Sequence, residues 1–208
     1  MDDRQLLRYS RQIMLPAFGI EGQERLRRAR VVVVGLGGLG SPVAMYLAAA
    51  GVGRLVLADF DAVDLSNLQR QILHTTERIG TPKAQSARTT LAALNPEVEL
   101  VLVKRSLTID TLPGLLTDVD LVVDCCDNFD TRFAVNAACV AARKPLVSGA
   151  ASGWRDRWRP SPANPADPAI NASFPGMAVP TRPAPPMAYW PRCPVSSAAS
   201  RRPRQSRS

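Results

Sequence analysis

The sequence predicts an α/β protein with a doubly wound, mostly parallel β-sheet. Two observations lead to this fold class: short apolar runs alternate with helical segments, and a glycine-rich turn joins the first apolar run to the first helix of the alternating part. Such alternation is typical of parallel strands that helices cover on both faces of the sheet. We expect residues 1–153 to form this domain, with residues 8–29 as a helical lead-in packed against the sheet.

Five apolar runs are predicted to be the strands. Residues 31–35, VVVVG, form a continuous apolar run of the kind that fills a parallel strand buried on both faces. The other four runs are RLVLADFD from Arg54, VELVLVKR from Val98, DLVVDCCDN from Asp120 and KPLVSGA from Lys144.

Helical segments are predicted between these strands. Residues 38–50 follow the glycine turn as a helix of small residues. A second helix is expected to begin at Thr81-Pro82, with the hydroxyl at the N-cap and the proline at the first helical position. Residues 130–143 are expected to form a third helix, capped by Asp130.

The last 55 residues differ from the rest of the chain. They contain 12 of the 18 prolines and nine arginines but only two acidic residues, whereas residues 1–153 hold 17 Lys and Arg and 16 Asp and Glu. We expect residues 154–208 to be a disordered tail, and the abrupt change after Gly153 suggests a shifted reading frame. The basic charge belongs to this tail, so we expect no nucleic-acid partner.

Other sequence features indicate where in the cell the protein is expected to act and whether it holds zinc. The first residues show no secretory signal pattern, and no apolar run approaches the roughly 20 residues of a membrane span. We therefore expect a cytoplasmic protein without a membrane contact. The four cysteines form no C-x-x-C pair, so no structural zinc site is expected, and Cys125 and Cys126 are interpreted as small buried thiols.

The glycine turn is the first candidate for a functional site. Gly35, Gly37 and Gly40 fit the G-x-G-x-x-G spacing, with Gly38 between them, and the helix N-terminus that follows offers N–H groups to a phosphate. Asp59 lies about 20 residues further on, at the end of the second strand, where a carboxylate can accept ribose hydroxyls. Together these features predict a nucleotide site.

A cluster after the second strand indicates which nucleotide. Asn67, Arg70 and Gln71 are spaced to share one face of a short helix. Lys83 lies in the first turn of the second predicted helix, where the helix dipole disfavours a cation unless an anion is nearby. Arg70 and Lys83 therefore suit a triphosphate better than a dinucleotide, although Lys83 alone could also be a solvated surface charge.

Asp127 and Asn128 follow the fourth strand, at the edge where ligands of parallel sheets bind. Asp127 could hold a Mg²⁺ that bridges phosphate oxygens, or it could cap the following helix. Asp124 lies inside the apolar run and is interpreted as structural, as is His74, the only histidine of the chain.

Six stretches, in this order, resemble the ubiquitin-activating-enzyme-like adenylyltransferases, most closely the bacterial ThiF/MoeB/HesA group. They are RYSRQIMLPAFGIEGQERL, GLGGLGSP, DFDAVDLSNLQRQ, GTPKAQSA, LNPEV and DCCDNFDTR. The resemblance is nearly continuous over residues 8–152. It implies a Rossmann-like fold and an enzyme that uses ATP to activate a sulfur carrier protein for molybdopterin or thiamine synthesis.

The resemblance also implies a reaction. The C-terminal glycine carboxylate of a ubiquitin-fold carrier that ends in Gly-Gly attacks the α-phosphate of ATP, which gives a carrier adenylate and pyrophosphate. This reaction needs positioning and charge neutralisation more than a nucleophilic side chain.

Site residues are implied by matching positions. Arg70, Lys83 and Asp127 are expected to act at the phosphates, with Asp127 placing Mg²⁺ beside Asn128. Arg11 matches an arginine that reaches the ATP site of the other subunit in a homodimer. The resemblance assigns these residues to nucleotide binding: Gly35, Gly37, Gly38, Gly40, Asp59, Asp61, Ser66, Asn67, Arg70, Gln71, Lys83, Asp127 and Asn128.

Two alternatives stay open at this point. Members of the family continue after LVSGA with further strands, a carrier-binding segment and often two C-x-x-C pairs, which this sequence lacks. The chain could therefore be a scaffold that keeps the fold without turnover. It could also be an NAD-dependent oxidoreductase, although the Asn67, Arg70, Gln71 and Lys83 cluster argues against a dinucleotide.

Overall fold

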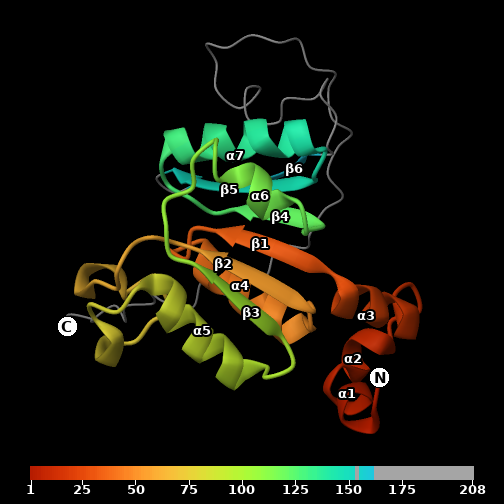
Figure 1. The fold of residues 1–208 in the computed structure, drawn as a ribbon. Helices are drawn as coiled ribbons and strands as arrows, with labels where there is room; N and C mark the ends of the chain where they lie inside the picture. The colour runs from red at the N-terminus through yellow and green to blue at the C-terminus, as the bar shows by residue number, and fades with distance from the viewer. Residues whose placement is uncertain (153–154, 162–208) are drawn as a thin grey trace, which may run out of the picture.

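A six-stranded sheet forms the centre of the molecule (Figure 1). The computed structural model describes residues 1–152 and 155–161. The strand order is β3-β2-β1-β4-β5-β6, and β1 to β5 run parallel to one another. The strands are β1 Arg30–Val34, β2 Arg54–Ala58, β3 Glu99–Val103, β4 Leu121–Asp124, β5 Leu146–Ser152 and β6 Arg155–Ser161.

Helices cover the sheet on both faces, as a doubly wound fold requires (Figure 1). Helix α4 packs beside α5 on one face, and α6 packs beside α7 on the other. The helices are α1 Asp3–Arg8, α2 Ser10–Ile13, α3 Gly19–Arg28, α4 Gly40–Ala50, α5 Lys83–Leu94, α6 Leu112–Leu116 and α7 Phe129–Ala142. Two short 3-10 turns, η1 Leu65–Asn67 and η2 Thr76–Arg78, lie between β2 and α5. The predicted fold class is confirmed, and α6 is an element that the sequence analysis did not assign.

The four valines of β1 explain why its sequence is a continuous apolar run. Val31 and Val33 join the core under α4 and α5, whereas Val32 and Val34 join the core under α6 and α7. Successive side chains of a strand point to opposite faces, so a strand with helices on both sides must be apolar at every position. None of these four side chains is more than 3% exposed.

The strand order places a binding crevice at one edge of the sheet. The chain proceeds from β1 outward to β2 and β3, then crosses to β4 on the other side of β1. In open parallel sheets, ligands bind beyond the carboxyl ends of the strands where the order reverses in this way. The residues after β1, β2 and β4 therefore meet at one place.

The lead-in packs against the end of α4 that lies away from this edge. The side chains of Gln12 and Gln23 both donate to the carbonyl of Ala50, at 3.2 and 2.9 Å. Tyr9 is only 2% exposed and lies so close to Gly51 that a Cβ there would be 2.5 Å from its ring. The expected helical lead-in is thus confirmed.

The start of α5 differs from the prediction. Pro82 is the N-cap, its backbone is extended (φ −53°, ψ 131°), and no side chain caps the helix. The preceding residues pair with the segment after β2, because Val63 donates to the carbonyl of Thr81 at 2.9 Å and Lys83 donates to that of Asp61 at 2.8 Å. This pairing holds Thr81 outside the helix, and a residue before proline also favours an extended backbone. The predicted Thr81 cap is therefore wrong.

The start of α7 also differs from the prediction, in a way that affects the site. The Asn128 side chain accepts from the N–H of Thr131 at 2.8 Å and caps the helix, while Asp130 lies within the first turn. The predicted Asp130 cap is wrong, and so is the alternative interpretation of Asp127 as the cap. Asp127 is left with an exposed carboxylate.

The sheet continues past the boundary predicted at residue 153. Strand β6 pairs antiparallel with β5, from Leu146 opposite Ser161 to Ser152 opposite Arg155. The disorder expected for the rest of the tail concerns residues 162–208, which lie outside the described residues, as does Cys193.

Among the residues that are described, no helix is long and apolar enough to cross a membrane.

The interpretation of Cys125 and Cys126 as buried thiols is confirmed, and Cys139 is buried as well. Burial raises the pKa of the Cys139 thiol to about 12. Because the thiolate is the reactive form, we expect iodoacetamide to alkylate Cys139 at least ~100-fold more slowly in the native protein than in urea. Mass spectrometry of the Cys139 peptide over time measures this ratio. Equal rates in both states would contradict the buried position.

Candidate functional site

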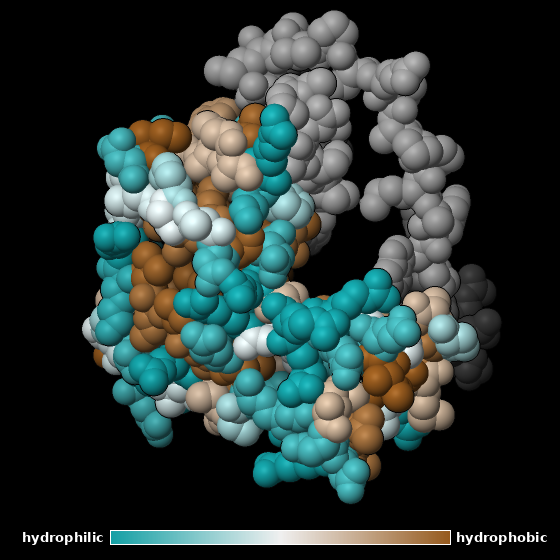
Figure 2. Space-filling view, turned by 45° about the vertical axis from the view of Figure 1, so that its right-hand side comes forward, coloured by the Kyte–Doolittle hydropathy of each residue, from teal (hydrophilic) through white to brown (hydrophobic). Residues whose placement is uncertain are grey.

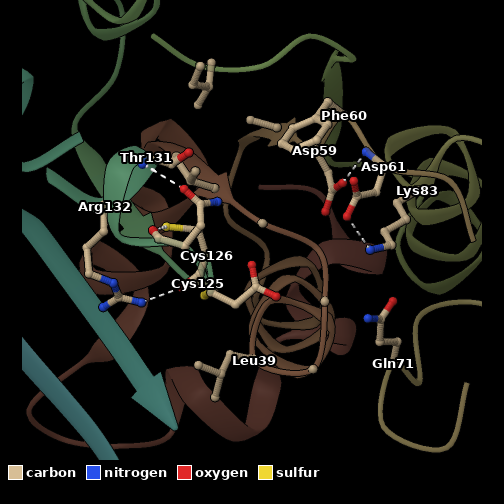
Figure 3. Close-up of a pocket in the computed structure, with 18 of the residues that line it drawn as sticks. Leu39, Asp59, Phe60, Asp61, Gln71, Lys83, Cys125, Cys126, Thr131 and Arg132 are labelled. Carbon is tan, nitrogen blue, oxygen red and sulfur yellow. Dashed lines mark hydrogen bonds and ion pairs between the residues drawn. The ribbon is translucent and has the colours of Figure 1, made fainter. Parts of the chain in front are cut away.

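A pocket of about 620 Å³ opens beyond the carboxyl ends of β1, β2 and β4. In Figure 3, Asp59, Asp61 and Lys83 lie on one side of it, with Cys126, Thr131 and Arg132 on the other. Most of the predicted site residues meet here. Those that line the pocket are Gly35, Gly37, Gly38, Asp59, Asp61, Arg70, Gln71, Lys83, Asp127 and Asn128.

The glycine turn lines the pocket with its backbone. At two of its glycines, the neighbouring backbone is too close to leave room for a side chain. Gly35 has a φ of +84°, and a Cβ there would lie 3.0 Å from the Cys125 backbone. A Cβ at Gly40 would lie 1.8 Å from the carbonyl oxygen of Gly35, so this glycine permits close contact between β1 and α4. Gly40 lies behind the turn and does not line the pocket.

Asp59 braces the glycine turn from the end of β2. One carboxylate oxygen accepts from the N–H of Leu36 at 2.7 Å, and the other accepts from the N–H of Asp61 at 2.8 Å. Burial raises the pKa of Asp59, while these two N–H groups and the Lys83 cation act in the opposite direction. Each oxygen keeps a lone pair free, so this half-buried carboxylate can still accept a ribose hydroxyl.

Lys83 is a buried cation at the wall of the pocket. Its side chain is 7% exposed and pairs with Asp61 at 2.9 Å, whereas the Asp61 side chain is 53% exposed. An ammonium has three N–H donors, and the described residues supply one hydrogen-bond acceptor for this one. A cation in the first turn of a helix opposes the helix dipole, so this position is suited to holding a bound anion.

Arg70 and Gln71 lie over the glycine turn. A Cβ at Gly38 would be 3.4 Å from the Arg70 stem, and a Cβ at Gly37 would be 3.5 Å from the Gln71 amide nitrogen. The Asn67 amide oxygen accepts from Arg70 at 2.9 Å and orients the guanidinium. Gln71 is 4% exposed, and among the described residues its amide oxygen has no hydrogen-bond partner.

Three further predicted residues do not line the pocket. Asn67 acts through the Arg70 guanidinium that it orients, and the Ser66 hydroxyl is occupied by the Asp64 carboxylate. Arg11 lies on α2, next to Gln12, which binds the far end of α4. The eleven residues of α4 span ~16 Å at 1.5 Å per residue. Arg11 therefore lies at the other end of α4 from this chain's own pocket.

Asp127 stands at the end of β4 with its carboxylate exposed at the pocket, and it forms no ion pair within the described residues. In this part of the chain, no three His, Cys, Asp or Glu side chains gather as a metal site. Mg²⁺ is commonly held by one or two carboxylates together with phosphate oxygens and water. A single unpaired carboxylate beside the glycine turn fits that pattern.

Arg132 is the main site residue that the sequence analysis missed. It donates to the carbonyls of Cys126 and Gly149 and to the Ser148 hydroxyl, the last at 2.7 Å. It also pairs at 3.3 Å with Asp124, which is fully buried. Arg132 thus holds the backbone that follows β4 and leads to the exposed carboxylate at the pocket, and the structural interpretation of Asp124 is confirmed.

Further residues that were missed follow strand ends or lie in the glycine turn and in helix α7. Arg105 follows β3 and lines the pocket. The rule that identified Asp127 could have found it, because both residues come after the carboxyl end of a parallel strand. Further lining residues are mostly apolar and lie on different sides of the pocket, among them Leu39, Phe60, Leu107, Phe129 and Thr131.

Comparison with known proteins extends this description. The sulfur carrier protein ThiS adenylyltransferase of Escherichia coli is 51% identical over 154 residues, which cover 74% of this chain and 61% of that protein. The molybdopterin-synthase adenylyltransferase of Salmonella typhimurium is 51% identical over 151 residues, which cover 73% of this chain and 61% of that protein. The chain thus spans less than two thirds of these relatives.

A solved structure agrees with the fold. The E. coli tRNA N6-threonylcarbamoyladenosine dehydratase TcdA in complex with ATP superposes with a TM-score of 0.70 at 30% identity. The match covers 74% of this chain and 64% of that one. The model of the ThiF family matches residues 9–198, so the chain belongs to the ThiF family.

Proposed function

We propose that the protein adenylates the C-terminal glycine carboxylate of a ubiquitin-fold sulfur carrier protein, with ATP as the second substrate and pyrophosphate as the product. The observation that carries this proposal is the meeting of a glycine turn, two cations and an unpaired carboxylate in one pocket of the described chain. The names of the relatives, two of which are carrier or molybdopterin-synthase adenylyltransferases, support the same reaction class.

The chain's own residues supply positioning and charge. The N–H groups at the start of α4, together with Gly37 and Gly38, which carry no Cβ, let phosphate oxygens come close to the backbone. Arg70 can grip two phosphate oxygens at once, and Lys83 adds a point charge. As the carrier carboxylate attacks, negative charge shifts toward the leaving pyrophosphate, and these cations stabilise it there.

Asp127 would hold Mg²⁺ in the pocket, and Asn128 next to it caps helix α7. When bound, the ion neutralises charge between phosphate oxygens. Asp59 would accept the ribose hydroxyls, and the neighbouring Phe60 would contact the adenine.

The partners are a carrier that ends in Gly-Gly and a second copy of this chain, and the protein acts in the cytoplasm. The homodimer is supported by the lead-in, which exposes large apolar side chains beside Arg11, such as Leu7 at 77% and Met14 at 71%. Apolar residues also gather in patches on the otherwise hydrophilic face in Figure 2. In the dimer, Arg11 of one copy would reach the ATP of the other.

Carrier-dependent ATP–pyrophosphate exchange tests the proposal. The full chain is incubated with ATP, Mg²⁺ and labelled pyrophosphate, with and without small ubiquitin-fold carriers that end in Gly-Gly. We expect label to enter ATP only when a carrier is present. ATP binding without exchange would favour the scaffold alternative, and tight binding of NADH with no ATP binding would favour the oxidoreductase.

The role of Asp127 gives a separate prediction. We expect Asp127→Asn to raise the Mg²⁺ concentration for half-maximal exchange about tenfold, equal to about 1.4 kcal/mol, because a neutral amide replaces a carboxylate ligand. Asp130→Asn is the matched control, since Asp130 is exposed on α7 and does not line the pocket. An unchanged Mg²⁺ dependence in Asp127→Asn would show that this carboxylate does not hold the ion.

A further inference from the structure

We propose that His74 is a positioning residue that fixes the glycine turn relative to Lys83, so that both can hold one triphosphate. The inference rests on the proposed function, which makes the turn and the lysine parts of one phosphate site. His74 does not line the pocket, and it is 6% exposed.

One ring nitrogen of His74 holds the glycine turn. Its Nε2 lies 3.0 Å from the carbonyl oxygen of Leu36, which stands between Gly35 and Gly37. The N–H of Leu36 is held by Asp59 at 2.7 Å. Both backbone polar groups of Leu36 are therefore bound by side chains from outside the turn, which fixes the direction of the neighbouring backbone N–H groups.

The other ring nitrogen reaches the helix that carries Lys83. Nδ1 lies 3.0 Å from the hydroxyl of Ser86, which is 1% exposed. Ser86 stands three residues after Lys83 on α5, so the two share one helix face. The imidazole is thus a rigid bridge between the glycine turn and the first turn of α5.

The neutral ring can form both hydrogen bonds of the bridge. A carbonyl only accepts, so Nε2 carries the hydrogen, and Nδ1 of the neutral ring accepts from the Ser86 hydroxyl. Burial lowers the pKa of His74, with Lys83 and Arg78 acting in the same direction and Asp59 against it. The neutral ring is therefore the form present at pH 7.

Other contacts attach the same segment to α5 without touching the turn. Thr90 donates to the carbonyl of Leu73 at 2.8 Å, and Arg78 donates to Thr90 and to the carbonyl of Ser86. A change at Thr90 therefore tests whether general attachment of this segment matters, whereas a change at His74 also removes its contact with the turn. This difference provides a matched control.

The consequence for function follows from geometry. Misplacement of reacting groups by ~1 Å can reduce a rate by about 100-fold. Without the imidazole, the turn loses its direct link to α5, and Asp59 with Asp61 is left as the connection to Lys83. ATP should therefore bind less tightly and react more slowly. A residue that only supported the fold would lower the melting temperature and leave both quantities unchanged well below the transition.

The test uses the full chain and four variants: His74→Phe, His74→Gln, Ser86→Ala and Thr90→Val. Calorimetry gives the Kd for ATP, exchange gives kcat and KM, and melting temperatures are recorded for all. We expect His74→Phe to weaken ATP binding about tenfold and to lower kcat. We expect a smaller loss in Ser86→Ala, partial rescue in His74→Gln, which keeps a donor for Leu36, and less than a twofold change in Thr90→Val.

The results of this test distinguish a failure of the positioning role of His74 from a failure of the proposed function. If the unmodified chain binds no ATP, the proposed function fails and the inference fails with it. If the unmodified chain binds ATP but His74→Gln and Ser86→Ala match Thr90→Val in Kd and kcat, only the positioning role is overturned. Should His74→Phe not fold, the two milder variants decide the matter by the same comparison.

Discussion

Lys83→Met is expected to reduce carrier-dependent exchange about 100- to 1000-fold, which corresponds to about 3–4 kcal/mol of lost transition-state stabilisation. Methionine keeps most of the length of the side chain and removes its charge. The lysine is 7% exposed, with Asp61 as its one ion-pair partner in the described chain, so its positive charge acts on a ligand through little intervening water. Removing it should leave the phosphates without the point charge of this lysine.

The same substitution should leave the fold intact. The Asp61 side chain is 53% exposed, so water can solvate its carboxylate once the ammonium is gone. The variant also removes a cation from a helix N-terminus, where it opposes the dipole. Exchange kinetics at several ATP concentrations and a thermal melt measure both expectations, with Lys104→Met as the control because Lys104 is exposed and does not line the pocket. Retention of more than about a third of the activity in Lys83→Met would contradict the role of this lysine, since the charge loss predicts a far larger effect.

Features set by local sequence were predictable. The run of valines in β1 requires helices on both faces of the sheet, and the glycine spacing requires a tight turn before α4. Once the strands are known to be parallel, their carboxyl ends must lie at one edge, which brings Asp59 and Asp127 together without any knowledge of the structure. The fold class and the placing of the glycine turn, Asp59 and Asp127 at one pocket follow from these rules.

Features set by contacts between distant residues were not predictable. Thr81 has the right chemistry for a helix cap, yet hydrogen bonds to the segment at residues 61–63 hold it outside α5. Asp130 and Asn128 are both good caps by composition, and only the backbone geometry at the start of α7 decides for Asn128. In the same way, His74 contacts Leu36, which lies 38 positions before it in the chain, and Ser86, which lies 12 positions after it. No sequence pattern connects these residues.

Arg132 belongs to this second group, and its removal is the largest change in stability that we expect. Sequence reasoning assigns an arginine on a helix to the solvent, because arginine is seldom buried. Here it is 7% exposed and pairs with Asp124, a carboxylate with no exposed surface that the apolar run of β4 carries into the core. Each charge makes burial of the other tolerable.

Arg132→Met should therefore lower the free energy of unfolding by about 3–5 kcal/mol, because it leaves the Asp124 charge buried without a cation. For a domain of this size, that loss corresponds to a decrease of roughly 10 °C in melting temperature. Arg28→Met is the control: its ion pair with Glu24 is exposed, so a loss of at most ~0.5 kcal/mol is expected. Urea denaturation of the full chain measures both.

The double variant Asp124→Asn with Arg132→Met separates the charge from the packing. It no longer contains an unpaired buried charge, so it should be more stable than Arg132→Met alone, and the two substitutions should be strongly non-additive. A neutral amide at position 124 needs no cation beside it, and its oxygen can still accept from the Ser148 hydroxyl, which donates to Asp124 at 2.8 Å in the unmodified chain. If the double variant is instead less stable than the unmodified chain by the sum of the two single losses, Arg132 stabilises the protein by packing and hydrogen bonding alone, and the buried ion pair contributes nothing.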